Sequence, residues 1–330
     1  MIRLVSLFLL LFGSLCAWES SEWIWDLALI QACDKGLHQT AEEYFKQDAF
    51  DEKAYAHIAK NDVVWVKSQF VKKFYKKVLP NVKNPFTLVI SDGDESFPSN
   101  SGLGKHVDEF INHPLITHIF AQNCDYRGSS PKISHLPIGL DFHTLAYKPP
   151  GHRWGKSASP AEQEASLRAL LQTLKPTHLR KKRAFVDFQH SNTMSASFHR
   201  EREFGENRTT IFNRLKPTGL IDYTDNRIPR AELWKTKGEY AFSISPPGNG
   251  LDCHRTWEDL VLGCIVIVKT SPLDPLYEGL PVVIVKDWSE VTEANLTKWL
   301  EQYKDAFTNP TYRTKLTNAY WLGKIRSASM

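Results

Sequence analysis

Short apolar runs, each ending in a polar loop, mark the strands expected in the first half of the chain. They follow a helix-rich start in which apolar and aromatic residues recur over positions 23–37 and 44–74. Strands are predicted at residues 86–91, 116–121 and 133–138, and a helical pattern at 106–112 separates the first two. Strands that alternate with helices and end in polar loops are typical of a parallel α/β layer.

A second alternation of the same kind begins after residues 148–160, where Pro, Gly, Ser and Lys predict a linker that leads into a polar helix at 161–174. The strands expected here are 183–189, 220–223, 240–244, 265–268 and 282–285. Helices are expected at 209–215, 229–237, 253–262, 293–303 and 311–325. The pattern predicts two facing Rossmann-like domains, with a C-terminal helix that is free to cross back.

The predicted boundaries are an N-terminal domain at 18–150, a linker and helix at 151–180, and a C-terminal domain at 181–330. Parallel sheets of this kind bind ligands at the carboxyl ends of their strands, so we expect the site in a cleft between the domains.

Charge and composition narrow the class of partner. The chain has 330 residues, of which 42% are apolar, and 41 Lys and Arg stand against 37 Asp and Glu. A net charge of +4 gives no whole-protein field that would favour nucleic acid. The short basic run at 180–183 follows a proline and has no interleaved aromatic residues, so we interpret it as a solvated interdomain segment.

The first 17 residues predict entry into the secretory pathway. Arg3 precedes an apolar run at 4–15, and Cys16 and Ala17 follow where a signal peptidase would cut. We expect cleavage and a location in the Golgi or ER lumen or outside the cell; a retained short signal anchor would instead hold the protein at a membrane. The sequons at Asn207 and Asn295 would be glycosylated there if exposed.

Residues 243–269 are the segment in which we expect an anion-binding site. Their pattern predicts a strand, a Gly-rich loop, the start of a helix and a buried strand, in that order. The loop contains Gly248, Asn249 and Gly250, which let the backbone approach a ligand, and free N–H groups at a helix start attract anions. Arg255 and Glu258 share a helical face. The guanidinium suits a diphosphate and the carboxylate suits ribose hydroxyls, so the pair predicts a nucleoside diphosphate site.

The alternative interpretation of Arg255 and Glu258 is an ordinary surface pair worth a few tenths of a kcal/mol. A surface pair does not explain the Pro-Gly-Asn-Gly loop that precedes it.

Residues 245–268, Ser-Pro-Pro-Gly-Asn-Gly-Leu-Asp-Cys-His-Arg-Thr-Trp-Glu-Asp-Leu-Val-Leu-Gly-Cys-Ile-Val-Ile-Val, resemble the donor-binding motif of exostosin-like glycosyltransferases. The resemblance extends to Pro281 and implies the two-domain GT-B architecture, a nucleotide-sugar donor and an inverting reaction that needs no metal or further cofactor. It implies that Arg255 contacts diphosphate and Glu258 ribose, with His254 beside the phosphate or sugar. The N-terminal domain would then take a glycan or glycoprotein acceptor.

An inverting transfer needs a base on the acceptor hydroxyl, which we expect from the N-terminal domain. Asp94 and Asp92 follow a predicted strand and are the candidates, although Asp-Gly-Asp is also a favourable turn sequence. Asp141 with His143 ends another strand similarly. An Asp-x-Asp could instead hold a divalent metal that bridges a donor diphosphate in the single-domain GT-A architecture.

Further candidates lie beyond the motif. Lys269 and Asp274 follow the next predicted strand, where sugar hydroxyls could be bound, whereas His190 is interpreted as a structural loop or core histidine. Two other functions remain open: a non-catalytic carbohydrate-binding relative of the fold, and a glycoside hydrolase, which would need two facing carboxylates and no diphosphate site.

Overall fold

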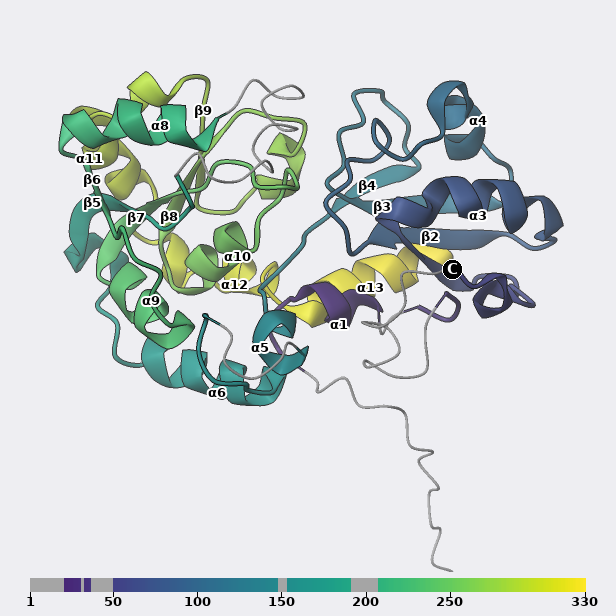
Figure 1. The fold of residues 1–330 in the computed structure, drawn as a ribbon, viewed down its shortest axis with the longest axis horizontal. Coiled ribbons are helices and arrows are strands. Elements are labelled where there is room, and N and C mark those ends of the chain that lie inside the picture. Colours follow the sequence, from purple (N-terminus) through teal and green to yellow (C-terminus); the bar gives the residue numbers. More distant parts are fainter. Residues whose placement is uncertain (1–20, 31–32, 37–49, 148–152, 191–206) are drawn as a thin grey trace, which may run out of the picture.

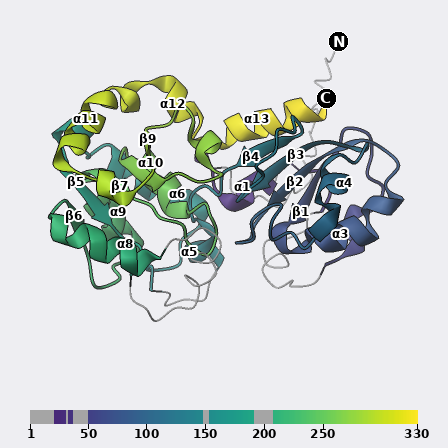
Figure 2. The same ribbon diagram turned by 90° about the horizontal axis from the view of Figure 1, so that it is seen from above.

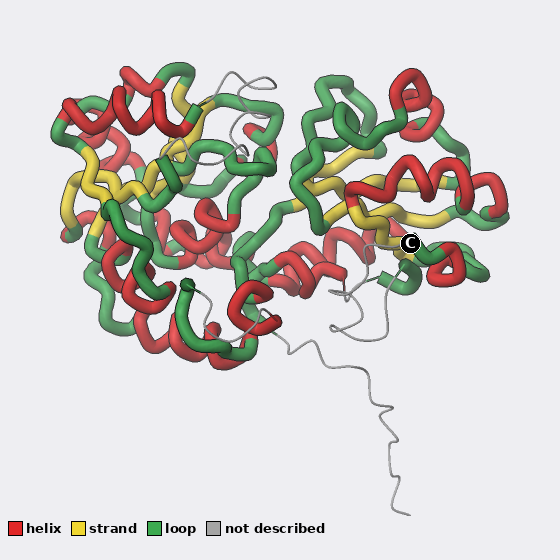
Figure 3. Tube along the Cα trace, in the orientation of Figure 1, coloured by secondary structure: helices red, strands yellow, loops and turns green. Residues whose placement is uncertain are grey.

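The computed structural model describes residues 21–30, 33–36, 50–147, 153–190 and 207–330, and shows two lobes, each built on a parallel sheet (Figure 1). In Figure 3 the strands lie within each lobe, the helices lie around them, and loops face the space between the lobes. The predicted signal segment at 1–17 lies outside the described residues. No helix in the described part of the chain is long and apolar enough to cross a membrane.

The first sheet has the order β1-β2-β3-β4, and every pairing is parallel. Its strands are β1 (Val63–Lys67), β2 (Phe86–Ser91), β3 (Ile116–Gln122) and β4 (Ile133–Leu136). Strand β1 corrects the sequence prediction, which placed these residues in a helix-rich stretch. Four of its five residues are buried, because Val64 and Val66 pack toward one face of the sheet and Val63 and Trp65 toward the other. A run of β-branched residues buried on both faces favours a strand over a helix.

Helices cover both faces of this sheet. Helices α3 (Val71–Lys77) and α4 (Val107–Ile111) share one hydrophobic cluster with the sheet, and α1 (Asp26–Ile30) belongs to the cluster on the opposite face. The predicted helix at 106–112 is therefore present as α4. Of the helical stretch predicted at 23–37, the described residues form only the five-residue α1.

The second sheet has the order β6-β5-β7-β8-β9, again with every pairing parallel. Its strands are β5 (Lys181–Val186), β6 (Ile221–Tyr223), β7 (Tyr240–Ile244), β8 (Ile265–Lys269) and β9 (Val282–Val285). The chain leaves β5 toward β6 on one side and then returns to place β7 on the other. Ligands bind in such sheets at this reversal point, here the carboxyl ends of β5 and β7.

The helices of the second lobe follow the sequence prediction closely. They are α8 (Arg208–Leu215), α9 (Arg230–Lys237), α10 (His254–Val261) and α11 (Glu293–Gln302). Helix α6 (Pro160–Leu171) begins with a capping box between Ser159 and Glu162 and packs against α9. A short helix, α5 (His143–Tyr147), precedes it.

The C-terminus crosses back to the first lobe, as predicted. One helix was expected at 311–325, but the chain forms α12 (Pro310–Thr314) and then α13 (Asn318–Ser329) after a new N-cap at Thr317. Helix α13 lies against α1 and strands β1, β2 and β3 (Figure 2). Thr87 Oγ1 donates to the Ala328 carbonyl at 3.2 Å, and Arg326 pairs with Asp34. The fold is thus two Rossmann-like domains linked by a C-terminal helix.

The four cysteines that lie in the described residues, Cys33, Cys124, Cys253 and Cys264, all carry free thiols. Three of them are buried, and burial raises the pKa of Cys124 to about 11 and that of Cys264 to about 12. The three buried thiols, of Cys33, Cys124 and Cys264, belong to the hydrophobic cores of the lobes.

Candidate functional site

A cleft of about 410 Å³ lies between the lobes and is lined by residues of both. The first lobe contributes Asp94, Ile138 and Asp141, which follow β2 and β4. The second contributes residues after β5 and β7 and the first turns of α10. The volume is within the range of small-ligand sites, and the position is the reversal point of the second sheet. Gly248, Asn249, Gly250, His254, Arg255 and Glu258, all predicted from the sequence, line it.

Helix α10 presents its first turn to the cleft. Its N-cap, Cys253, makes no capping hydrogen bond through its side chain, and the preceding Pro-Pro-Gly-Asn-Gly segment cannot extend the helix backward. On the opposite side, Trp257 and Leu260 are buried in the core. Burial of this apolar face fixes the helix so that Arg255 and Glu258, three residues apart, both reach the cleft.

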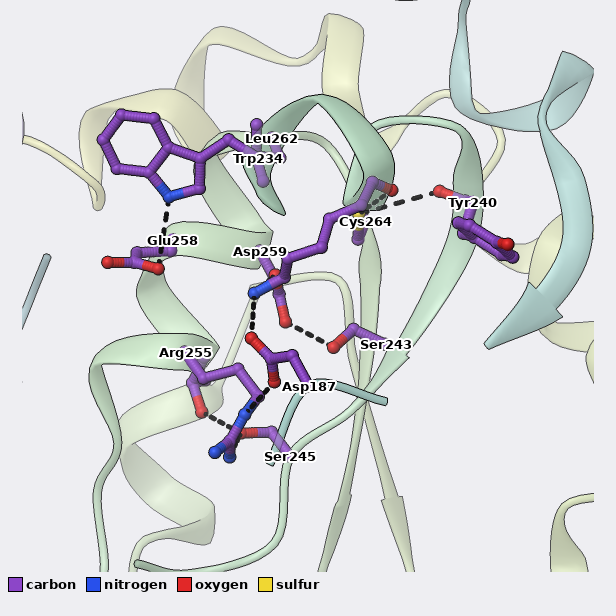
Figure 4. A network of polar contacts seen from close by, with 12 residues as sticks. Asp187, Trp234, Tyr240, Ser243, Ser245, Arg255, Glu258, Asp259, Leu262 and Cys264 are labelled. Atoms are coloured by element: carbon purple, nitrogen blue, oxygen red, sulfur yellow. Dashed lines mark hydrogen bonds and ion pairs between the residues drawn. The ribbon is translucent and has the colours of Figure 1, made fainter. Parts of the chain in front are cut away.

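Arg255 is held where β5 and β7 end (Figure 4). Its Nε pairs with Asp187, the residue that follows β5, and its Nη1 lies 3.4 Å from both Ser245 Oγ and the Pro246 carbonyl after β7. Within the described part of the chain, Nη2 has no hydrogen-bonding partner. The contacts therefore orient the guanidinium while leaving donors that a phosphate group could use.

A buried ionic network supports Arg255 from behind. Lys237, at the end of α9, is 1% exposed and lies 2.8 Å from Asp187 and 2.5 Å from Asp259. Ser243 Oγ donates to Asp259. Although burial opposes it, the charges of Lys237 and Arg255 lower the pKa of Asp187 to about 2. Burial raises the pKa of Asp259 to about 6, although the charge of Lys237 opposes the rise.

This network was missed by the sequence analysis. Two carboxylates and two cations compensate one another, as a buried set of charges must. Its charged members come from the loop after β5, from α9 and from α10, so no spacing in the sequence predicts the set.

Glu258 is buried and accepts a hydrogen bond from Trp234 Nε1 at 3.2 Å through its Oε2 atom. The indole belongs to α9 and fixes the carboxylate against the wall of the cleft (Figure 4). The surface-pair interpretation of Arg255 and Glu258 is wrong, because each side chain has a partner on another element and both line the cleft.

Arg208 is a second cation at this end of the cleft, and the sequence analysis missed it. It begins α8, its Nε donates to the Pro247 carbonyl at 2.8 Å, and burial together with the charge of Arg255 lowers its pKa to about 10. A Cβ at Gly248 would lie 2.9 Å from its guanidinium, so the glycine makes room for Arg208 itself. The available signal was Asn207-Arg208-Thr209, which was interpreted only as a sequon. In the structure the Asn207 side chain caps α8.

The loop after β4 also touches the motif. His254 Nδ1 lies 2.8 Å from the Gly139 carbonyl and so donates to it, while Asp141 pairs with Arg230 and His143. Burial would raise the pKa of Asp141, but the charges of His143, Arg230 and His254 hold it far below its usual value. Asp141 is thus a structural anion rather than a group suited to accept a proton.

Asp94 and Asp92 separate in the structure. Asp94 is exposed and lines the cleft, whereas Asp92 adopts a left-handed backbone (φ 56°) and pairs with Lys67 at 3.1 Å, away from the lining residues. The alternative metal site would need both carboxylates on one ion, and Lys67 already occupies the place of a cation at Asp92.

Besides Asp92, three further residues singled out from the sequence lie outside the cleft lining. Asp274 holds its own turn by accepting from Ser271 N and Thr270 Oγ1, and Lys269 ends β8 without reaching the lining. His190 stacks on Phe212 with 3.7 Å between the ring centroids, in agreement with its interpretation as a structural histidine.

No protein-family model matches the chain, and no curated protein sequence matches it. Among solved structures, similarity is found to the α,α-trehalose 6-phosphate synthase of Burkholderia multivorans, with 12% identity, a TM-score of 0.35, and coverage of 84% of this chain and 73% of that one. The E. coli trehalose-6-phosphate protein bound with UDP-2-fluoro glucose is 11% identical, with a TM-score of 0.35 and coverage of 84% of this chain and 73% of that one. The N-terminal domain of Candida albicans trehalose-6-phosphate phosphatase is 12% identical, with a TM-score of 0.37 and coverage of 84% of this chain and 75% of that one. These similarities are too low to carry an argument.

Proposed function

We propose that the chain is an inverting GT-B glycosyltransferase that moves a sugar from a nucleoside diphosphate donor to a hydroxyl of a glycan or glycoprotein. One observation carries the proposal: Arg255 and Glu258 lie on adjacent turns of α10, each oriented by a partner, in a cleft that Asp94 lines from the other lobe. The similarity of residues 245–268 to the exostosin-like motif supports it. No second function is favoured by a contact in the described residues.

In this proposal the diphosphate lies against Arg255, Arg208 and the first turn of α10. The cations and the helix N-terminus offset the charge that develops on the leaving diphosphate, which is the role a metal ion plays in other transferases. Glu258 accepts hydrogen bonds from the ribose hydroxyls, and Trp234 holds it in place. We propose no metal and no cofactor besides the donor.

Asp94 is the proposed base. It takes the proton of the acceptor hydroxyl as that oxygen bonds to the anomeric carbon, and the bond from this carbon to the diphosphate breaks with its electron pair going to the leaving group. Attack from the face opposite the diphosphate inverts the anomeric configuration. The first lobe then binds the acceptor and the second the donor. The apolar segment at 4–15 supports a place in the secretory pathway.

The test is calorimetric titration of the protein with UDP, GDP and their sugars, with and without EDTA. We expect binding that survives EDTA and weakens about 10- to 150-fold in Arg255→Ala and in Arg208→Gln, since each loses charge-assisted hydrogen bonds worth about 1.5–3 kcal/mol. Arg214→Gln is the matched control on α8, because Arg214 pairs with Asp287 outside the cleft lining.

Circular dichroism of each variant confirms that the fold is retained. Absence of nucleotide binding by the unaltered protein would contradict the proposal. Binding that EDTA abolishes and Arg255→Ala leaves intact would place the donor on a metal at Asp92 and Asp94 instead.

A further inference from the structure

Asn123 connects the two lobes at the cleft. It follows β3, is fully buried, and has a left-handed backbone (φ 49°) that non-glycine residues adopt at an energetic cost. Its Nδ2 donates to the Gly93 carbonyl at 3.0 Å, and its Oδ1 accepts from the Asp252 backbone N–H at 2.8 Å. One amide therefore joins the turn that carries Asp94 to the loop that begins α10.

The donor loop is shaped to receive this amide. A Cβ on Gly250 would lie 2.9 Å from Asn123 Nδ2, which is closer than real Cβ atoms come to other atoms, and 3.0 Å from Oδ1, which is tighter than most such contacts. The backbone of Gly250 does not have the left-handed conformation that by itself demands glycine. Gly250 was predicted to admit a ligand, but the atom nearest to its missing Cβ belongs to Asn123.

A second group of contacts fixes the same loop. The buried Asp252 carboxylate accepts from the Ile138 N–H at 2.8 Å and from Trp257 Nε1, and its neighbour His254 donates to Gly139. These bonds join α10 to the loop after β4. The contact through Asn123 differs from them because it leads to the turn of Asp94.

The turn itself is held independently. Gln122 accepts from Asp92 N at 3.1 Å and donates to the Gly93 carbonyl at 3.3 Å. Loss of the Asn123 amide would therefore leave the turn folded and remove its tie to the donor loop.

We infer that Asn123 is a positioning residue that sets the Asp94 carboxylate relative to a donor bound at Arg255. The inference rests on the proposed function. An inverting transfer requires the acceptor oxygen, the anomeric carbon and the leaving diphosphate in line, with the base within hydrogen-bond reach of the acceptor hydroxyl. A misplacement of about 1 Å can cost about 100-fold in rate. Asn123 is buried and is not among the residues that line the cleft, so we expect its loss to affect turnover rather than donor binding.

The first variant is Asn123→Gly, which keeps the left-handed backbone and deletes the amide. The assay is release of nucleoside diphosphate from whichever UDP- or GDP-sugar the unaltered protein binds most tightly, with water as acceptor. We expect kcat to fall about 100-fold while KM for the donor and the calorimetric affinity for UDP or GDP stay within threefold. Asn61→Gly is the matched control: an exposed asparagine with φ 69° before β1, expected to change neither constant.

A second variant pair tests the contact directly. Gly250→Ala drives a methyl group into the Asn123 amide, so it should lower kcat as well. The double variant Gly250→Ala/Asn123→Gly removes the clash and should be no slower than Asn123→Gly alone. Such non-additivity is expected only if the two residues act through one contact.

The outcomes separate the two proposals. If the unaltered protein binds neither UDP nor GDP, the proposed function fails. If it binds and hydrolyses a donor but Asn123→Gly keeps kcat within threefold, the positioning role of Asn123 is refuted. Loss of nucleotide affinity in Asn123→Gly would also refute it, because the amide would then serve the donor loop rather than Asp94. Additive effects of the two substitutions would argue against the contact with Gly250.

Discussion

Replacement of Lys237 by methionine tests whether the buried network of Lys237, Asp187, Asp259 and Arg255 stabilises the second lobe. Methionine keeps an unbranched stem of similar length and removes the charge that lies 2.8 Å from Asp187 and 2.5 Å from Asp259. Two carboxylates then face one remaining cation, Arg255. Breaking a buried ion pair from one side costs about 3–5 kcal/mol, because one charge is left without compensation.

The loss should depend on pH in a defined direction. Burial raises the folded-state pKa of Asp259 to about 6, above its ordinary value of 3.8. A carboxyl with a raised pKa contributes stability that is full below the ordinary value and is lost as pH rises through the folded value. Protonation of Asp259 also removes the uncompensated charge in Lys237→Met. The difference between variant and unaltered protein should therefore be largest near pH 8 and shrink toward pH 5.

Urea unfolding followed by tryptophan fluorescence at pH 8 and pH 5 measures both effects. Lys235→Met is the matched control, because Lys235 lies on the same helix and is exposed; it should change the unfolding free energy by less than about 0.5 kcal/mol. A loss below about 1 kcal/mol in Lys237→Met at pH 8, or an equal loss at both pH values, would refute the argument.

Two further predictions concern the walls of the cleft. Glu258→Gln should weaken UDP or GDP binding by about tenfold but leave inorganic pyrophosphate binding unchanged, because the carboxylate is proposed to bind the ribose alone. Calorimetric titration with the nucleotide and with pyrophosphate measures both affinities. Equal weakening of the two would contradict the assignment of Glu258 to ribose. Burial raises the pKa of Asp252 to about 6, so its stabilising contribution is full below about pH 4 and is lost as pH rises through 6. In Asp252→Asn, the unfolding free energy should therefore fall less steeply with pH between pH 4 and pH 7 than in the unaltered protein. An unchanged pH dependence of the unfolding free energy would show that Asp252 does not titrate in this range.

The sequence predicted most of the framework because each element is encoded locally. Strands β7 and β9 occur at the residues predicted for them, since each is an apolar run bounded by loop residues. Strand β1 was missed because the stretch 44–74 that contains it is rich in aromatic and apolar residues on both sides of the strand, and the short signal Asn61-Asp62 before it was not used. Burial on both faces of a sheet, which defines β1, depends on α13 from the far end of the chain.

The motif residues of the site were predictable from the sequence, but their partners were not, because the partners depend on how distant elements pack. Arg255 and Glu258 belong to one helix and share a face at a spacing of three, so their partnership in the cleft follows from local geometry. The partners that orient them, Asp187 and Trp234, come from other elements and are selected by the packing of α9 and α10 on the sheet. The periodicity of apolar residues in the sequence does not identify which side chain of another element pairs with Arg255 or Glu258.

Asp141 and Asp94 show why a carboxylate at a strand end is not by itself a base. Both follow strands of the first sheet and both line the cleft. Asp141 is committed to Arg230, whose guanidinium is itself buried and donates to both the carboxylate and the backbone of Asp141. To accept a proton, Asp141 would have to leave that cation uncompensated, which is costly in a buried place. Asp94 lines the cleft with an exposed side chain, and in the proposed reaction it is the carboxylate of the first lobe that we assign as the base.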